Sequence, residues 1–211
     1  RINAAGKDCD SPRVAMDNLG NAIIVWVQSD GSHNQIFRAE YRNFSWTLPS
    51  SLSANISPDG QPADYPEVAM DDQGNAIIVW AQLDGSKYRI FKSEYRNGAW
   101  ADPADLTKGI SPPQTDASSP MVAMDNDGSA VIVWMQNNDA SLPQAFKSEY
   151  RNGNWTHPSN ILDSISPIIP NGTMAVEPKV TMDHRGNAII SWRQFSGGTA
   201  NLMSVFISEY R

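Results

Sequence analysis

Apolar and polar positions follow one another along this chain in a pattern that recurs four times. Each copy contains a short apolar stretch, a polar turn of the form Asp-x-x-Gly, and a run such as Ala-Ile-Ile-Val-Trp that is almost entirely apolar. The four copies are Val14 to Gln28, Val68 to Gln82, Val122 to Gln136 and Val180 to Gln194. A run of this length, rich in β-branched and aromatic residues, predicts a β-strand that is covered on both faces.

The spacing of the copies indicates an array of repeated structural units. Successive copies start 54, 54 and 58 residues apart, so the third unit is longer, and we place its four-residue insertion around Ile168 to Met174. A period near 50 residues is typical of propeller arrays, whereas helical solenoids repeat about every 33–47 residues. We therefore interpret 1–211 as a single domain with repeat units at approximately 12–65, 66–119, 120–177 and 178–211.

Within a unit the pattern predicts four strands, as the second copy illustrates. The predicted strands are Pro66 to Met70, Asn75 to Gln82, Tyr88 to Arg96, and a fourth that starts at Trp100 and runs through the Leu106 region. Asp71 and Gly74 suit the first hairpin turn, and Asn97-Gly98 is a strong signal for another. Gly or Pro interrupts every window of helical length, so we expect no helix. The fold class predicted is all-β, a β-propeller of four-stranded blades.

The last unit is shorter than the others, because the sequence stops where its third strand ends, at Tyr210 and Arg211. This unit therefore lacks the tryptophan-bearing fourth strand of the other three. An unprotected edge strand promotes pairing with other chains. We expect the chain to be part of a larger ring. The alternatives are a self-contained four-bladed ring and closure by another chain, as a homo-oligomer through the open blade edge.

Composition and charge argue against several classes of partner. Forty per cent of the 211 residues are hydrophobic and 18% are charged, which is ordinary for a globular domain. The formal net charge of -7 argues against a nucleic-acid partner. The chain contains no run of about 18 apolar residues, so we expect no membrane insertion. Cys9 is the single cysteine and aligns with Ala63 and Ala117, which favours a passive thiol over a nucleophile.

The repeat resembles the tandem repeats of secreted or surface bacterial proteins with propeller architecture. The resemblance rests on the unit Pro-x-Val-Ala-Met-Asp-x-x-Gly-Asn-Ala-Ile-Ile-Val-Trp-x-Gln and extends over nearly the whole chain. It implies an exported bacterial protein, secreted or at the cell surface. It is specific for the fold and leaves the ligand undefined, because such arrays serve many binding roles.

The Asp-x-x-Gly turns also invite comparison with the Asp-box of sialidases, Ser-x-Asp-x-Gly-x-Thr-Trp. The spacing differs, because Gly74 lies three residues after Asp71 instead of two. The active site of a sialidase also requires an arginine cluster and a Tyr–Glu nucleophile pair, and each of these groups occurs once in such an enzyme. Here Glu-Tyr-Arg begins at Glu40, Glu94, Glu149 and Glu209. We interpret a group that occurs in every blade as structural.

Tryptophans also occupy equivalent places in the repeats. They are Trp26, Trp80, Trp134 and Trp192 on the second strands and Trp46, Trp100 and Trp155 on the fourth. Tryptophan can stack on sugar rings, but a residue that recurs in every blade is better explained by packing between blades. We therefore assign these side chains to the core.

Positions that differ between units carry the functional argument. In a four-stranded blade, the loops between strands two and three share one face with the connections between blades. These loops vary while the turns on the opposite face are nearly constant, and repeat arrays commonly build ligand sites on one such face. The predicted ligand-binding residues of this variable loop face are Asp30, His33, Tyr65, Asp84, Tyr88, Asp139 and Phe195. The alternative is loop drift without a ligand.

We expect no catalytic residue, no metal and no cofactor. The histidines lie in different units, at His33, His157 and His184, without the spacing of metal ligands. The stretch from Asp125 to Gly128 resembles the start of a calcium loop but lacks the later bidentate glutamate.

The resulting prediction is a non-catalytic, exported binding module that recognises carbohydrate or protein through the variable loop face. One alternative is a glycan-active, sialidase-like hydrolase module, which would need two carboxylates about 5–9.5 Å apart in a pocket. A second alternative is a structural repeat that assembles through its open edges.

Overall fold

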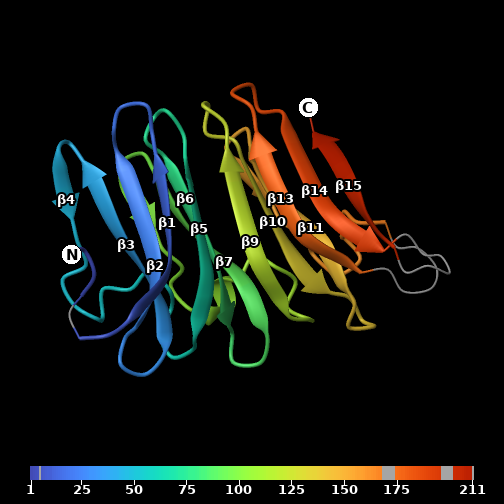
Figure 1. Cartoon of the computed structure of the whole chain (residues 1–211), viewed down its shortest axis with the longest axis horizontal. Coiled ribbons are helices and arrows are strands. Elements are labelled where there is room, and N and C mark those ends of the chain that lie inside the picture. Colours follow the sequence, from blue (N-terminus) through green and yellow to red (C-terminus); the bar gives the residue numbers. More distant parts are fainter. Residues whose placement is uncertain (5, 168–173, 196–201, 211) are drawn as a thin grey trace.

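A computed structural model of the chain confirms four consecutive antiparallel β-sheets (Figure 1). It describes residues 1–4, 6–167, 174–195 and 202–210. Blade 1 comprises β1 (Cys9–Met16), β2 (Ala22–Ser29), β3 (Asn34–Arg42) and β4 (Ser45–Thr47). Blade 2 comprises β5 (Ala63–Met70), β6 (Ala76–Leu83), β7 (Tyr88–Arg96) and β8 (Ala99–Ala101). Blade 3 comprises β9 (Ala117–Met124), β10 (Ala130–Asn137), β11 (Pro143–Arg151) and β12 (Asn154–Thr156). Blade 4 comprises β13 (Ala175–Met182), β14 (Ala188–Phe195) and β15 (Met203–Tyr210).

Within each blade, successive strands pair antiparallel, and the register is nearly the same from blade to blade. Trp80 lies opposite Phe91 in blade 2, and Trp134 lies opposite Phe146 in blade 3. The second pair is one residue further apart in sequence than the first. One of the four inserted residues therefore lies in the β10–β11 hairpin, which corrects our placement of the whole insertion around Ile168 to Met174. Residues 168–173 lie outside the described part of the chain.

In blade 2, for which the strands were predicted, two strands differ in length from the prediction. In blade 2 the first strand begins at Ala63, three residues before Pro66, because a β-bulge between Asp64 and Glu67 lets the ladder continue past the proline. The fourth strand is only three residues long and ends at Ala101.

The Leu106 region forms a short helical turn, which corrects the predicted fourth strand and the expected absence of helix. A 3-10 helix spans Leu106–Lys108, and Asp105 caps it by accepting a hydrogen bond from the backbone N–H of Thr107 at 2.8 Å. No helix in the described ranges is long and apolar enough to cross a membrane.

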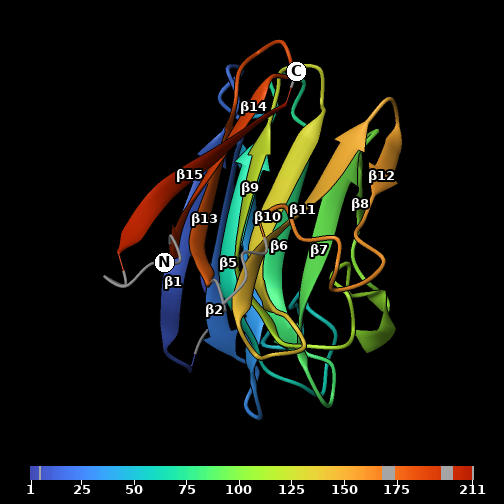
Figure 2. The ribbon, with the colours of Figure 1, turned by 90° about the vertical axis from the view of Figure 1, so that its right-hand side faces the viewer.

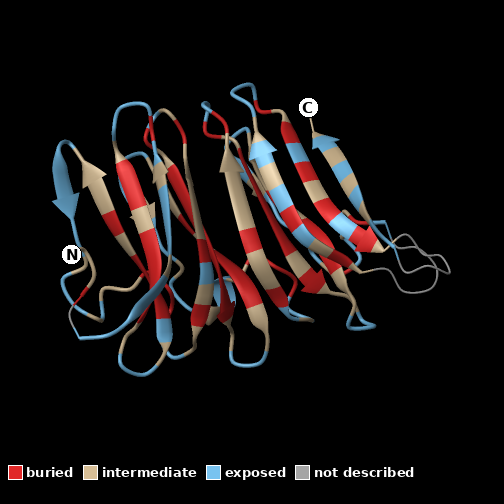
Figure 3. Ribbon diagram, in the orientation of Figure 1, coloured by how far each residue is buried: buried red, intermediate tan, exposed pale blue. Residues whose placement is uncertain are grey.

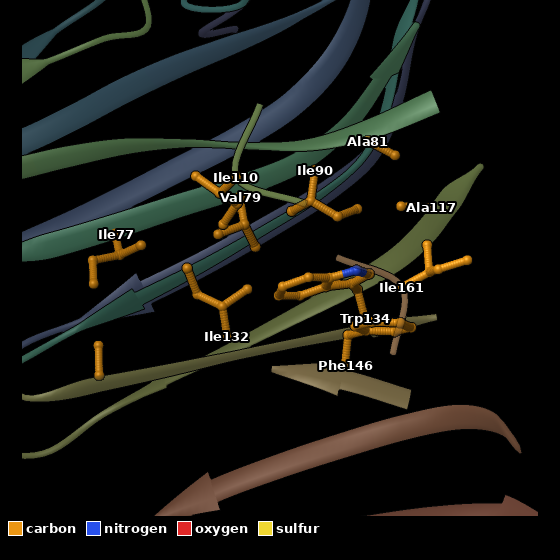
Figure 4. Packing of buried hydrophobic residues seen from close by; sticks show 11 residues of the cluster. Ile77, Val79, Ala81, Ile90, Ile110, Ala117, Ile132, Trp134, Phe146 and Ile161 are labelled. Atoms are coloured by element: carbon orange, nitrogen blue, oxygen red, sulfur yellow. The ribbon is translucent and has the colours of Figure 1, made fainter. Parts of the chain in front are cut away.

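The blades pack face to face, which explains why their second strands lack a polar face. Between blades 2 and 3, Ile77 and Val79 of β6 pack with Ile132 and Trp134 of β10, and these four side chains are fully buried (Figure 4). The same layers recur between the other neighbouring blades. Apolar side chains are buried on both faces of β6 and β10, and this burial stabilises the stack through the hydrophobic effect.

The blades form an open row and not a self-contained four-bladed ring. Successive first strands contact one another, β1 with β5, β5 with β9, and β9 with β13. These strands lie along one side of the row, and the short strands β8 and β12 lie along the other (Figure 2). Blades 1 and 4 stand at opposite ends (Figure 1). Burial decreases at blade 4, where exposed positions alternate along β14 and β15 (Figure 3).

Candidate functional site

The Asp-x-x-Gly turns are held by their own side chains. In blade 2, Asp71 Oδ1 accepts hydrogen bonds from the backbone N–H groups of Gln73 at 2.9 Å and Asn75 at 2.8 Å. Asn75 Nδ2 donates to Asp71 Oδ2 at 2.7 Å. Backbone bonds of the same kind surround the aspartates of the other turns, Asp17, Asp125 and Asp183. These aspartates stabilise the turns, which is why they recur.

The Trp-x-Gln sequence of each second strand joins that strand to the connection between blades. Trp80 Nε1 donates to Gln82 Oε1 at 3.1 Å, and Gln82 Nε2 donates to the carbonyl oxygen of Pro58 at 2.6 Å. The indoles that make the same bond in the other blades are Trp26, Trp134 and Trp192. All four are at most 4% exposed, which confirms their assignment to the core.

In blades 1 to 3, the Glu-Tyr-Arg sequence of the third strand contacts the next blade. Trp100 Nε1 of β8 donates to Glu40 Oε1 of β3 at 2.7 Å, and the Arg38 guanidinium lies 4.0 Å from the centroid of the Trp100 ring. The Arg42 guanidinium lies 3.9 Å from the centroid of Tyr95. These hydrogen-bonded and cation–π contacts hold neighbouring blades together, so the repeated glutamate is structural, as expected.

The variable loop face contains a cavity beside blade 1. Its volume is about 390 Å³, and its walls are Asp30, Ser32 and His33 of the β2–β3 hairpin and Leu52, Ser53, Asn55, Asp59 and Gly60 of the connection to blade 2. Two predicted ligand-binding residues, Asp30 and His33, thus line one cavity. The other polar groups in its walls come from Ser32 of the same hairpin and from Ser53, Asn55 and Asp59 of the connection between blades, and the predicted site did not include them.

Hydrogen bonds fix the polar groups of this cavity. Asp30 Oδ1 accepts from the backbone N–H groups of Ser32 at 2.6 Å and His33 at 2.8 Å. Burial would raise the pKa of Asp30, but these bonds outweigh it and hold the pKa below its ordinary value. In the connection between blades, Asn55 Nδ2 donates to Asp59 Oδ1 at 2.9 Å. The cavity therefore presents an ionised, oriented carboxylate at neutral pH.

Asp84 and Tyr88 occupy the corresponding hairpin of blade 2, in different surroundings. Asp84 Oδ1 accepts from the backbone N–H of Lys87 at 2.9 Å, and its Oδ2 lies 3.6 Å from Arg89 Nη1. Arg89 is buried and stands where blade 1 has Gln35. Tyr88 is partly buried against the core between blades 2 and 3. Because Arg89 neutralises its carboxylate, Asp84 is less available to a ligand than Asp30.

The remaining predicted ligand-binding residues lie on three different blades. Asp139 is exposed in the β10–β11 turn of blade 3. Phe195 ends β14 of blade 4, half-buried, and the loop that follows it lies outside the described residues. Tyr65 belongs to β5 and is 59% exposed. Among the cavities described here, the structure brings together Asp30 and His33 and leaves the other five apart.

Each first strand carries a strained residue at its bulge. Non-glycine residues with positive φ occur there in every blade, at Ser11 (51°), Tyr65 (58°), Ser119 (52°) and Glu177 (56°). Non-glycine residues rarely adopt such angles, and bulges and strained residues cluster beside functional sites. The bulged side of the row is therefore a second region of interest.

Asp64, directly before the bulge of β5, was absent from the predicted site. Burial raises the pKa of Asp64, a hydrogen bond from Asn34 opposes this, and the charge of Asp10 adds to the rise. Asn34 follows His33, so the hairpin that lines the cavity also contacts Asp64. The residue was missed because the first strand was predicted to start at Pro66. The sequence did contain a signal for Asp64, because Asp10 and Asp64 both stand two residues before a proline.

Within the described residues, no group of three or more His, Cys, Asp or Glu side chains is arranged to hold a metal ion. Cys9 is free and exposed, and partial desolvation raises the pKa of its thiol. The loop face offers hydrogen bonding and charge, from Asp30, His33 and their neighbours.

No family model matches the chain, and no curated protein is similar to it. Its fold resembles that of a Hadza microbial sialidase, with a TM-score of 0.60 and 14% identity over 95% of this chain and 44% of the sialidase. An unknown-function protein of Dyadobacter fermentans has a TM-score of 0.59 and 11% identity, over 98% of this chain and 68% of that one. The α-L-arabinanase of Penicillium chrysogenum complexed with arabinobiose has a TM-score of 0.56 and 12% identity, over 96% of this chain and 62% of that one.

These likenesses identify the class of the protein as an all-β chain of propeller blades. The chain spans less than half the length of the sialidase and under two thirds of the arabinanase. At these identities the likeness concerns the fold alone, and function has to be argued from the site.

Proposed function

We propose that this protein is a binding module, secreted or at the cell surface, that takes up a carbohydrate at the loop end of blade 1. The observation that carries the proposal is the cavity of about 390 Å³ lined by Asp30, His33 and Asn55. Its carboxylate and amide oxygens accept the hydrogen bonds that sugar hydroxyls donate. Carbohydrate is preferred over a protein ligand because the solved proteins of this fold include a sialidase and an arabinanase with bound arabinobiose.

The geometry of Asp30 supports binding in a further way. Two backbone N–H groups orient its carboxylate before any ligand arrives. A preorganised acceptor loses little conformational freedom on binding, so more of the interaction energy appears as affinity. A hydrogen bond to a charged acceptor contributes about 1.5–3 kcal/mol, which corresponds to roughly a tenfold or larger change in affinity.

The test is a glycan-array screen of the purified chain, followed by calorimetry with the best sugar. We expect Asp30→Asn and His33→Ala to weaken binding about tenfold or more. Asp72→Asn serves as the matched control, because Asp72 lies in a turn at the opposite end of the blades, and it should bind like the unmodified chain. Tight binding that survives both loop substitutions would place the site elsewhere, and no binding by a folded chain would contradict the proposal.

Glycoside hydrolysis is a second candidate, favoured by the raised pKa of Asp64 next to the charge of Asp10. A carboxyl group that stays protonated can act as a general acid while a second carboxylate stays ionised. If this holds, hydrolysis of chromogenic glycosides should fall as the pH rises through the pKa of Asp64, because the acid form is then lost. Asp64→Asn should remove the activity, with Asp30→Asn as comparison. Absence of hydrolysis together with sugar binding that depends on Asp30 would favour the binding module.

A further inference from the structure

The cavity at the loop end of blade 1 adjoins a second cavity. The second has a volume of about 210 Å³, and its walls are Arg38, Glu40, Thr47, Leu48, Pro49, Ala54, Asn55, Ile56 and Asp102. Asn55 belongs to the walls of both cavities. Its chain neighbours are divided between them, because Ser53 lines the first cavity and Ala54 and Ile56 line the second. The connection between blades 1 and 2 therefore carries one polar side chain at the place where the two cavities meet.

Hydrogen bonds hold the amide group of Asn55 in this place. Its Nδ2 donates to the backbone carbonyl oxygen of Ser57 at 2.7 Å and to Asp59 Oδ1 at 2.9 Å. The two N–H donors of the amide are thus used within the connection. The amide oxygen is the group with which Asn55 can accept a hydrogen bond from a ligand hydroxyl.

The second cavity has its own polar groups, and one of them is particular to blade 2. Arg38 donates from Nη1 to Asp102 Oδ1 at 2.7 Å and from Nε to Glu40 Oε1 at 3.3 Å, so its charge is balanced within the scaffold. The side chain of Asp102 stays 37% exposed. At the position of Asp102, directly after the fourth strand, blades 1 and 3 have Leu48 and His157. Asp102 is therefore not part of the recurring scaffold.

Carboxylates outnumber cations in the walls of the two cavities. Of the side chains that are charged at neutral pH, the walls contain one cation, Arg38, and four carboxylates, those of Asp30, Glu40, Asp59 and Asp102. Within the described residues, no Lys or Arg forms an ion pair with Asp30 or Asp59. In blade 2, by contrast, Arg89 lies 3.6 Å from Asp84. A sugar that bears a carboxylate would be repelled by these walls, whereas an uncharged sugar can donate its hydroxyl hydrogens to them.

We propose that the carbohydrate site of blade 1 continues across Asn55 into the second cavity and binds a linear oligosaccharide of uncharged sugar units. This inference rests on the proposed function, in which Asp30 and His33 hold the first unit. The following units pass the amide oxygen of Asn55 and reach Asp102 and the exposed Thr47. Ligand sites usually measure about 300–1,000 Å³. The first cavity lies at the lower end of this range and the second below it, so a longer ligand has to use both.

The first measurement compares ligand lengths and charges by calorimetry on the full chain. The probes are the monosaccharides and tetrasaccharides of arabinose, xylose, glucose and mannose, with tetragalacturonate and sialyllactose as acidic probes. For the neutral sugar that binds best, the tetrasaccharide should bind about tenfold more tightly than the monosaccharide, because units in the two cavities then belong to one molecule. The acidic probes should bind at least about tenfold more weakly than that tetrasaccharide.

Two substitutions of equal charge change separate the second cavity from a general charge effect. Asp102→Asn removes a carboxylate from the second cavity and should lower the ratio of tetrasaccharide to monosaccharide affinity about fivefold, because hydrogen bonds to charged acceptors are the stronger ones. Asp116→Asn removes a carboxylate that lines neither cavity, and the ratio should stay that of the unmodified chain. Thr47→Val keeps the shape of the wall and removes one hydroxyl, and it should lower the ratio even if Asp102→Asn unfolds the chain.

The outcomes distinguish this extended site from the binding module on which it rests. Equal affinities for monosaccharide and tetrasaccharide, both dependent on Asp30, would overturn the extended site and leave the binding module in place. An equal fall of the affinity ratio in Asp102→Asn and Asp116→Asn would also overturn the extended site. An acidic probe that binds more tightly than every neutral tetrasaccharide would overturn the choice of uncharged sugars. A folded chain that binds none of the probes would contradict both the binding module and its extension.

Discussion

At the scale of the residue, recurrence distinguishes structural side chains from candidates for binding. Trp80, Gln82 and Asp71 recur in each blade, and their hydrogen bonds stay within the scaffold. Asp30 also has counterparts, but the surroundings differ, since Arg89 approaches the carboxylate of Asp84 in blade 2. The identity of one neighbour thus decides whether the same loop aspartate remains free for a ligand.

Two of the three fourth-strand tryptophans, Trp100 and Trp46, provide a matched test of the blade contacts. Trp100→Phe removes the N–H that donates to Glu40 and weakens the contact with Arg38, so we expect the free energy of unfolding to fall by about 1–2 kcal/mol. Trp46 is 44% exposed at the first blade, and Trp46→Phe should cost less than about 0.5 kcal/mol. Urea denaturation followed by circular dichroism measures both. Equal losses of unfolding free energy in the two variants would show that the contact of Trp100 with Glu40 does not stabilise the protein.

At the scale of the element, the hairpin turns of neighbouring blades are stacked on one another. Gly128, in the β9–β10 turn, has φ of +86°, and a Cβ there would lie 2.9 Å from Arg96 Nη1 and 3.1 Å from Asp71 Oδ2. Gly98, in the β7–β8 turn, has φ of +81° and no neighbour within 4 Å of the same point. Two turns with similar φ angles therefore differ in how closely a neighbouring blade approaches.

Alanine at these two glycines should separate backbone strain from crowding. Both substitutions place an L-residue at positive φ, which costs about 1–2 kcal/mol. Gly128→Ala also displaces Arg96 and Asp71 from their positions in blade 2, so its loss of unfolding free energy should exceed that of Gly98→Ala by roughly 1 kcal/mol or more. Chemical denaturation of the pair gives the difference directly. A result in which Gly98→Ala is the more damaging variant would contradict the stacking of the turns.

At the scale of the whole molecule, stability depends on how many neighbours a blade has. Blades 2 and 3 are covered on both faces, and Trp80 and Trp134 are fully buried. Blade 4 has one covered face, and Val205 and Ile207 of β15 are 74% and 62% exposed. In such a row each blade is stabilised by its contacts with adjacent blades, as in other repeat proteins.

Hydrogen–deuterium exchange should therefore rank the blades. The amides of β6 and β10 should exchange slowest, and those of β14 and β15 should exchange faster by an order of magnitude or more, because blade 4 opens without disturbing the others. Mass spectrometry of peptic peptides resolves these segments. Uniform protection across the four blades would indicate that the row unfolds as one cooperative unit.

The sequence alone was sufficient for the repeat, the all-β class and the structural role of the repeated residues. This succeeded because hydrophobic periodicity and turn chemistry are local, so Ala76–Leu83 and the Asp71 turn are specified by their own side chains. Strand ends were harder to predict, since the bulge beside Tyr65 and the helical turn at Leu106–Lys108 depend on single prolines and caps.

Tertiary structure decided which polar groups meet. Asp30 and Asn55 face one cavity although 24 residues separate them in sequence, and no period in the sequence relates them. The same holds for Asp64 and Asn34, and for Lys147 and Tyr210. These contacts arise because stacking places the loops and edges of different blades side by side. A pattern of apolar positions specifies that the blades stack, but it does not specify which loop side chains the stacking brings into contact.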